Sequence, residues 1–238
     1  SRRFNFDARC REGGECLPQL LIRRRRNMLM ESTMIEKLRE ERYIFNLLKH
    51  IFWAEPAKEF LRDIQNVDII PEEDEIDRGL NLIIETVKSN NSRLDEYLND
   101  LSLEFARLFI GPKNPPAIPY ASFYLSESKT IMSDVTIDVR KMYLDAGMAV
   151  QNLYSIPDDH IGIELEFLQY LTEKTIDLFE HGQREDASRL YEMREDFLND
   201  HMASWIPFFA DKVIESTQDD FYKGAAFILK GIIKNGHF

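Results

Sequence analysis

Cysteine, glycine and proline are scarce in this sequence, and long apolar runs are missing from it. Cys10 and Cys16 are the two cysteines among 238 residues, so the rest of the chain is no secreted disulfide scaffold, and their spacing matches no common zinc motif. Ten glycines and nine prolines exclude fibrous and linker-like classes. The longest apolar runs, such as residues 225–229, are far shorter than the roughly 20 residues that cross a bilayer. We therefore expect a cytoplasmic protein without membrane insertion.

Basic residues are outnumbered, with 30 lysines and arginines against 42 acids and a net charge of −12. This balance argues against nucleic acid or anionic lipid as the main partner, because both need clustered positive charge. Residues 1–27 nevertheless carry eight arginines and three acids, so the remaining residues carry a net charge of −17. Residues 1–4 have the start of a twin-arginine export signal, Ser-Arg-Arg-Phe, but no apolar stretch follows them. We expect an extraneous or flexible basic arm over residues 1–27, ahead of a strongly acidic domain.

Helical enzymes usually carry recognisable metal or phosphate motifs, and the sequence lacks them. None of the five histidines follows a glutamate by three positions, so the paired Glu-x-x-His motif of di-iron bundles is absent. There is also no His-Glu-x-x-His motif, no His-Asp dipeptide, no Asp-Asp-x-x-Asp and no glycine-rich phosphate loop. These absences favour a protein that is not an enzyme and holds no cofactor or metal.

The apolar spacing is helical almost throughout, and no alternating strand pattern is present. The pattern predicts an all-α fold of about eight to ten helices, in which residues 28–238 form one domain with subdomains near 32–154 and 158–236. After a first helix from about residue 32 to residue 54, helices are predicted over residues 56–65, 71–88, 92–110, 134–146, 158–181, 185–199, 201–215 and 218–234. Residues 111–120 hold four prolines and are predicted to form an irregular loop.

Two acids and a histidine open the helix predicted after Pro157. Asp158 or Asp159 is expected to cap this helix by accepting backbone N–H groups. His160 and Glu164 fall on its apolar arc, four residues apart, although burying a charge without a partner is costly. The pattern indicates either a self-satisfied His160–Glu164 pair, or a polar pocket or hinge contact.

Two further groups of residues combine aromatic and polar side chains. His201 and Trp205 are four residues apart and therefore share a helix face. Tyr120, Phe123 and Tyr124 follow the proline-rich loop, where aromatic side chains can line a peptide groove.

Several of these motifs together resemble a known family. The run Pro-Asp-Asp-His-Ile-Gly-Ile-Glu-Leu-Glu-Phe over residues 157–167 is similar to the signature of the TorD/DmsD/NarJ-like redox-enzyme maturation chaperones. Three other elements agree with that family in order and spacing: Arg-Leu-Phe-Ile-Gly-Pro at 107–112, Tyr-x-Ser-x-Tyr at 120–124, and Phe-Leu-x-x-His-x-x-x-Trp at 197–205. The resemblance covers about residues 32–234.

The resemblance implies an all-helical, TorD-like cytoplasmic chaperone without catalytic activity. Its implied partners are the twin-arginine signal peptide and the catalytic subunit of a molybdopterin oxidoreductase, which it holds until the cofactor is inserted before export. It also implies a hinge near residues 155–160, a monomer or a domain-swapped dimer, and weak GTP binding. The peptide-binding and hinge residues expected from this resemblance and from the motifs are Asp158, Asp159, His160, Glu164, Tyr120, Phe123, Tyr124, His201 and Trp205.

Physical chemistry agrees with this expectation, because arginines pair with carboxylates in two-point geometry and an acidic domain attracts a basic peptide. Two alternatives stay open. One is a small all-α hydrolase or nucleotide-binding protein that uses His160 and Glu164, and the other is a helical scaffold whose acidic surface only maintains solubility.

Overall fold

The computed structural model describes residues 17–111, 114–149 and 156–235, with side chains from residue 31 onward and up to residue 234. Most of the predicted basic arm, including both cysteines, lies outside the described residues. The first helix begins at Leu17 rather than near residue 32, and it continues to Trp53.

The regular elements in these ranges are helical, which confirms the all-α prediction. They are α1 (Leu17–Trp53), α2 (Lys58–Gln65), α3 (Glu75–Ser89), α4 (Leu94–Phe105), α5 (Ala121–Leu125), α6 (Asp134–Asp145), α7 (Ile161–Glu180), α8 (Arg184–Asp196), α9 (Ile206–Ser216) and α10 (Asp220–Asn235). Short 3-10 turns, η1 (Asn91–Arg93) and η4 (Met202–Ser204), and π-helical turns, η2 (Ala106–Ile110) and η3 (Phe197–His201), connect some of them. Among the described residues, one isolated antiparallel bridge joins Tyr120 and His160.

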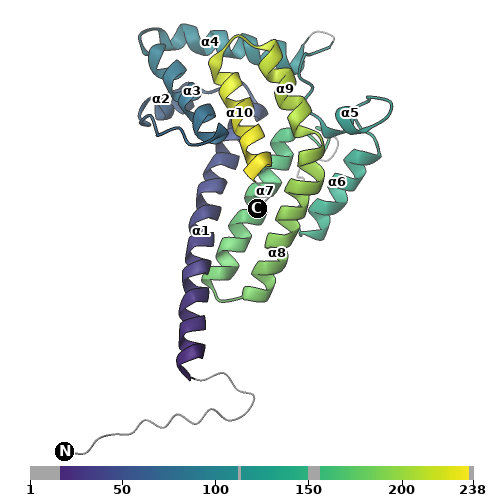
Figure 1. The fold of residues 1–238 in the computed structure, drawn as a ribbon. Coiled ribbons are helices and arrows are strands. Elements are labelled where there is room, and N and C mark those ends of the chain that lie inside the picture. Colours follow the sequence, from purple (N-terminus) through teal and green to yellow (C-terminus); the bar gives the residue numbers. More distant parts are fainter. Residues whose placement is uncertain (1–16, 112–113, 150–155, 236–238) are drawn as a thin grey trace, which may run out of the picture.

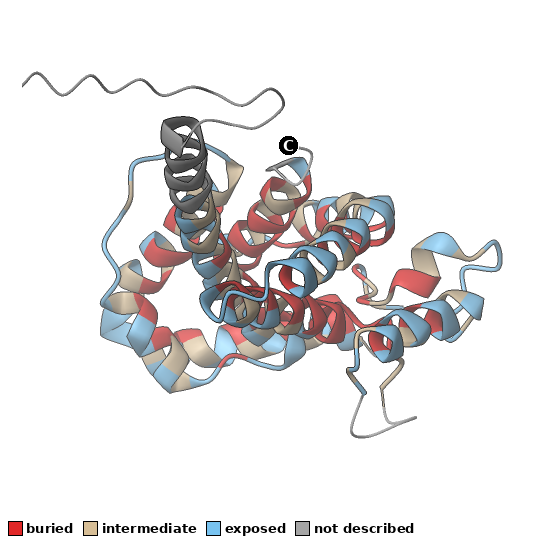
Figure 2. Cartoon of the chain, turned by 90° about the horizontal axis from the view of Figure 1, so that it is seen from below, coloured by how far each residue is buried: buried red, intermediate tan, exposed pale blue. Residues whose placement is uncertain are grey.

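The longest helices run side by side. α1 packs along α7 and α7 packs on α8, while α10 packs against α3 and α9 (Figure 1). Where side chains are described, buried residues lie on the inner faces of the helices and exposed residues on the outer faces (Figure 2). Aromatic rings fill the centre, where Phe52 and Phe109 lie with centroids 5.6 Å apart and Phe209 contacts both. No helix in the described ranges combines the length and the apolar character needed to span a bilayer.

Helices α3 and α10 approach each other unusually closely at glycines. A Cβ atom on Gly79 would lie 2.4 Å from the carbonyl oxygen of Gly224, and one on Gly231 would lie 2.6 Å from Ile76 Cγ1. Glycine is therefore required here for close packing, although it is a poor helix former in isolation.

Helix α6 lies at the edge of the bundle, beside α5 (Figures 1 and 2). Its main backbone contacts within the described structure are with α5, whereas the long helices each pack along a long neighbour. Side chains rather than backbone proximity therefore hold α6 against the rest of the molecule.

Candidate functional site

The segment before α7 is buried and connects to α6. Asp158 is fully buried, and its carboxylate accepts a hydrogen bond and forms an ion pair with Arg140 of α6. Tyr143 Oη, from the same helix, donates to the backbone carbonyl of Asp158 at 2.9 Å. Asp158 therefore binds α6 through both its side chain and its backbone.

Asp159 bridges two helices. One of its carboxylate oxygens accepts from Thr136 Oγ1 of α6 at 2.8 Å, and the other accepts from the backbone N–H of Ser122 in α5 at 2.7 Å. The prediction that Asp158 or Asp159 caps the following helix is wrong. His160 is the N-cap of α7, and its Nδ1 accepts from the N–H of Gly162 at 3.1 Å.

His160 lies in an aromatic environment. Its ring contacts Tyr120 and Trp53 edge-on, with centroids 5.0 and 5.8 Å away. Burial lowers the pKa of His160 to about 4, against the opposing effect of Asp159. The imidazole is therefore neutral at pH 7, which suits an Nδ1 that accepts a hydrogen bond.

The predicted His160–Glu164 pair does not form. Glu164 is fully buried, and its oxygens lie 2.7 Å from His201 Nε2 and 3.1 Å from Trp205 Nε1. Burial raises the pKa of Glu164, and the neighbouring His201 opposes that rise. Burial by itself would lower the pKa of His201, but Glu164 outweighs it and the pKa is raised. The two groups therefore behave as a coupled pair that joins α7 to η3.

The aromatic residues after the proline-rich loop continue this cluster. Tyr124 stacks on Trp205 with centroids 5.6 Å apart, and Phe123 meets Tyr124 edge-on at 5.3 Å. The predicted site residues thus form one continuous network, which is buried except for the half-buried Tyr120, Phe123 and Tyr124. Asp158, Asp159, Glu164 and Trp205 have no exposed surface, so they offer no contact surface to a ligand in this conformation.

An accessible site lies beside this network, between α6 and the end of α8. We call it the acidic groove; its volume is about 460 Å³. Its lining residues are Leu125, Val135, Asp138, Met142, Asp145, Phe167, Met193, Asp196, Phe197, Asp200, His201 and Ser204. His201 belongs both to this lining and to the internal network, through its bond to Glu164.

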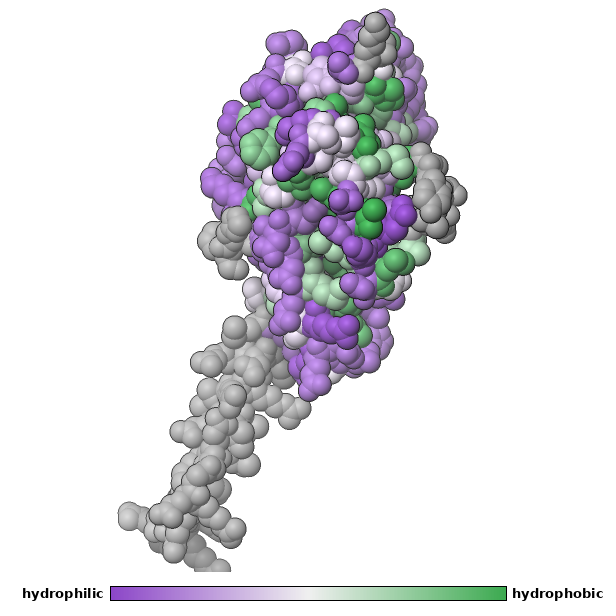
Figure 3. All heavy atoms as spheres, turned by 90° about the vertical axis from the view of Figure 1, so that its right-hand side faces the viewer, coloured by the Kyte–Doolittle hydropathy of each residue, from purple (hydrophilic) through white to green (hydrophobic). Residues whose placement is uncertain are grey.

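The acidic groove combines apolar walls with exposed carboxylates. Of its four aspartates, Asp138 pairs with Lys141 at 2.8 Å, whereas Asp145, Asp196 and Asp200 make no ion pair within the described part of the chain. Figure 3 faces the α5–α6 side of the molecule and shows apolar patches among hydrophilic side chains. Such a groove suits a cationic group next to an apolar segment.

These aspartates do not stand out in the sequence, because exposed acids on helix surfaces are common in so acidic a chain. A signal was present nonetheless. Residues 135, 138, 142 and 145 repeat with helical spacing and alternate between apolar and acidic, as do residues 193, 196, 197 and 200. Two such faces on different helices predict an acidic, apolar surface, but the sequence does not show that they face each other.

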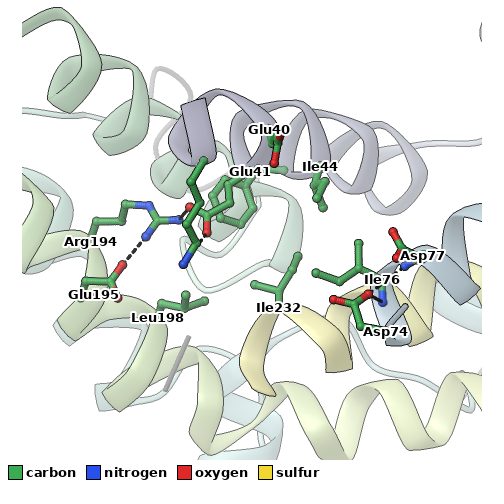
Figure 4. A pocket seen from close by; sticks show the side chains of 12 residues that line it. Glu40, Glu41, Ile44, Asp74, Ile76, Asp77, Arg194, Glu195, Leu198 and Ile232 are labelled. Carbon is green, nitrogen blue, oxygen red and sulfur yellow. Dashed lines mark hydrogen bonds and ion pairs between the residues drawn. The ribbon is translucent and has the colours of Figure 1, made fainter. Parts of the chain in front are cut away.

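A second, smaller pocket of about 230 Å³ lies between α1, α3, α8 and α10 (Figure 4). Arg194 points into it and is almost fully buried, with ion pairs to Glu41 and Glu195 and a 3.0 Å bond from Nε to Thr172 Oγ1. These partners hold the guanidinium within the fold. Across the described residues, no cluster of His, Cys, Asp or Glu is arranged to hold a metal ion.

Comparisons with known proteins identify the family. The family model for the nitrate reductase delta subunit matches residues 73–211. The chaperone protein TorD of Aliivibrio fischeri is 30% identical over 166 residues, covering 69% of this chain and 75% of that protein. TorD of Vibrio parahaemolyticus is 25% identical over 77% of this chain and 86% of its own length. TorD of Vibrio cholerae is 23% identical over 87% of this chain and 94% of its own length. The order of the sequence motifs, the all-α fold and these matches agree, and the chain belongs to the TorD/NarJ family of redox-enzyme maturation chaperones.

Proposed function

We propose that this chaperone binds the twin-arginine signal peptide of a molybdopterin oxidoreductase subunit in the acidic groove, in the cytoplasm and before export. The observation that carries the proposal is the groove itself, whose lining combines apolar side chains with Asp145, Asp196 and Asp200, three exposed acids that make no ion pair within the described residues. A twin-arginine signal has the matching chemistry, with two guanidinium groups followed by an apolar segment.

Each part of such a peptide has a counterpart in the acidic groove. Guanidinium groups form two-point hydrogen bonds with carboxylates, which lysines cannot reproduce. Apolar side chains can replace water against Leu125 and Met142, which are both more than one-third exposed. The predicted site residues then act from behind the groove, since His201 is the member of that set that lines it.

The proposal requires no catalytic group and no cofactor. Glu164 is engaged by His201 and Trp205, so the hydrolase alternative loses the His160–Glu164 pair on which it depended. Weak GTP binding and domain swapping about residues 155–160 stay predictions of the resemblance.

Calorimetric titration with a twin-arginine peptide and its twin-lysine counterpart tests the proposal. The variant Asp145→Asn/Asp196→Asn/Asp200→Asn should bind the arginine peptide roughly five- to thirtyfold more weakly, at about 0.3–0.7 kcal/mol for each exposed pair. The control variant Asp63→Asn/Asp68→Asn/Glu85→Gln removes the same charge from exposed positions around α2 and α3. Equal affinity of both variants and of both peptides would show that the acidic groove is not the site.

A further inference from the structure

Helix α6 has two faces that do different things. Residues 135, 138, 142 and 145 line the acidic groove. The adjacent face carries Thr136, Arg140 and Tyr143, one helical turn apart, and each of these bonds to Asp158 or Asp159. The same helix therefore forms one wall of the groove and is fastened to the segment before α7.

These three bonds fasten α6 to the segment before α7, in addition to its apolar packing. Tyr143 also packs on Phe167 of α7 with centroids 4.6 Å apart, and Val139 is buried, but the main backbone contacts of α6 in the described structure are with the short helix α5. Asp159 fastens α5 as well, through the N–H of Ser122, and α5 supplies Leu125 to the groove. One buried acid thus positions both helices of that wall.

We propose that Asp158 and Asp159 are positioning residues for peptide binding. Their bonds to α5 and α6, which we call the latch, hold the α5–α6 wall so that its aspartates face those of α8 and η3. This inference rests on the proposed function of the acidic groove. It assigns to the Pro-Asp-Asp-His segment an indirect part, because the two carboxylates have no exposed surface and bond to Arg140, Thr136 and the N–H of Ser122 within the fold.

The sign of the change in peptide affinity on removing Arg140 distinguishes the latch from a simple electrostatic effect. Arg140→Ala removes a positive charge near the acidic groove, so electrostatics alone predicts tighter binding of a cationic peptide. The latch predicts the opposite, because loss of Arg140 leaves α6 loosely held. Lys141→Ala is the matched control, since it removes the same charge from the next residue of α6 and frees Asp138.

We expect Arg140→Ala to weaken twin-arginine peptide binding about fivefold or more, while Lys141→Ala leaves it unchanged or tighter. Because Arg140→Ala also leaves Asp158 without its cation, the milder Thr136→Val serves as a second variant. It is nearly isosteric, removes the 2.8 Å bond to Asp159 and should weaken binding in the same direction. Tighter binding by both variants would overturn the latch.

Amide hydrogen exchange provides a readout that needs no peptide. In full-length Arg140→Ala and Thr136→Val, amides of α6 should exchange faster while those of α7 stay protected. Unchanged α6 exchange would overturn the latch even if the wild-type protein binds the peptide. Faster α6 exchange in a protein that binds no twin-arginine peptide would instead refute the proposed function and leave the fastening of α6 established.

A double-mutant cycle adds the energetic test. If the latch aligns the wall, Asp145→Asn should cost much less affinity in the Thr136→Val background than in the wild type. Strictly additive losses would mean that Thr136 acts independently of the acidic groove, and the latch would be wrong.

Discussion

Single buried polar residues carry much of the organisation of this molecule. Glu164 accepts hydrogen bonds from two side chains that lie 37 and 41 residues away, and Asp159 accepts from a backbone N–H of α5 and a side chain of α6. Buried charges of this kind are tolerated because their partners satisfy them, and they become costly once a partner is removed. The interior network therefore makes its members sensitive to substitution.

Replacing Glu164 tests this directly. Glu164→Ala leaves His201 and Trp205 without their acceptor and opens a cavity, so the free energy of unfolding should fall by about 3–5 kcal/mol. Glu166→Ala, two residues along α7 and exposed, should change it by less than about 0.5 kcal/mol. Urea unfolding followed by circular dichroism measures both, and similar losses would contradict the account.

His160 should make stability depend on pH. Its pKa in the folded protein is about 4, below the ordinary value of 6.5, so between these values the unfolded chain binds the proton more readily. The stabilisation is complete above pH 6.5 and is lost as the pH falls toward 4, by up to about 3 kcal/mol.

The variant His160→Asn keeps a side-chain acceptor for the N–H of Gly162 but cannot titrate. The wild type should therefore lose stability relative to this variant as the pH is lowered from 7 to 4. Denaturant titrations at several pH values measure the difference, and parallel curves for the two proteins would show that His160 titrates normally.

Helix periodicity predicted which residues of α7 turn inward but not what they meet. Both His160 and Glu164 are buried, as their place on the apolar arc indicates. Their spacing suggested a mutual bond, yet Glu164 bonds to His201 of η3. Which residues so far apart in sequence bond to each other depends on how the helices pack. The apolar pattern of a single helix does not show how it packs against others.

At the scale of elements, close helix packing depends on small residues. α3 and α10 cross at Gly79 and Gly224, where each backbone lies against the other. Helix α6 is fastened differently, because its side chains bond to the 158–159 segment.

Gly224→Ala should therefore destabilise the protein, although alanine favours helix formation. The added Cβ would lie 2.5 Å from the carbonyl oxygen of Gly79 and 2.7 Å from Ile83 Cγ1, and such overpacking costs about 1–3 kcal/mol. Lys234→Ala, exposed on the same helix, should be nearly neutral. Thermal unfolding compares them, and a Gly224→Ala protein as stable as the wild type would mean that the helices can separate freely.

Most long helices were predictable because each has an apolar face that repeats every three to four residues. The five-residue α5 was missed, since it follows the proline-rich loop and is too short to show a period. The π-helical turns η2 and η3 were read as the ends of ordinary helices, because one extra residue per turn shifts the apolar pattern only slightly.

At the scale of the whole molecule, the net charge of −12 favours encounter with a basic peptide. The groove aspartates are exposed, and salt screens exposed charges with a length of about 10 Å at 0.1 M. Peptide affinity should fall as salt rises from about 0.05 to 0.5 M, and the fall should be smaller for the triple groove variant. Fluorescence anisotropy at several salt concentrations measures both slopes, and a flat wild-type response would point to apolar contacts alone.

The central claim is that the signal peptide lies in the acidic groove, and site-specific photo-crosslinking tests it most directly. A benzoylphenylalanine placed at Ser204, which lines the groove, is compared with one at Ser89, an exposed serine at the end of α3. If the peptide lies in the acidic groove, it should crosslink to the Ser204 position and not to the Ser89 position, and an excess of unlabelled peptide should abolish the product. Crosslinking at Ser89 with none at Ser204 would contradict this claim.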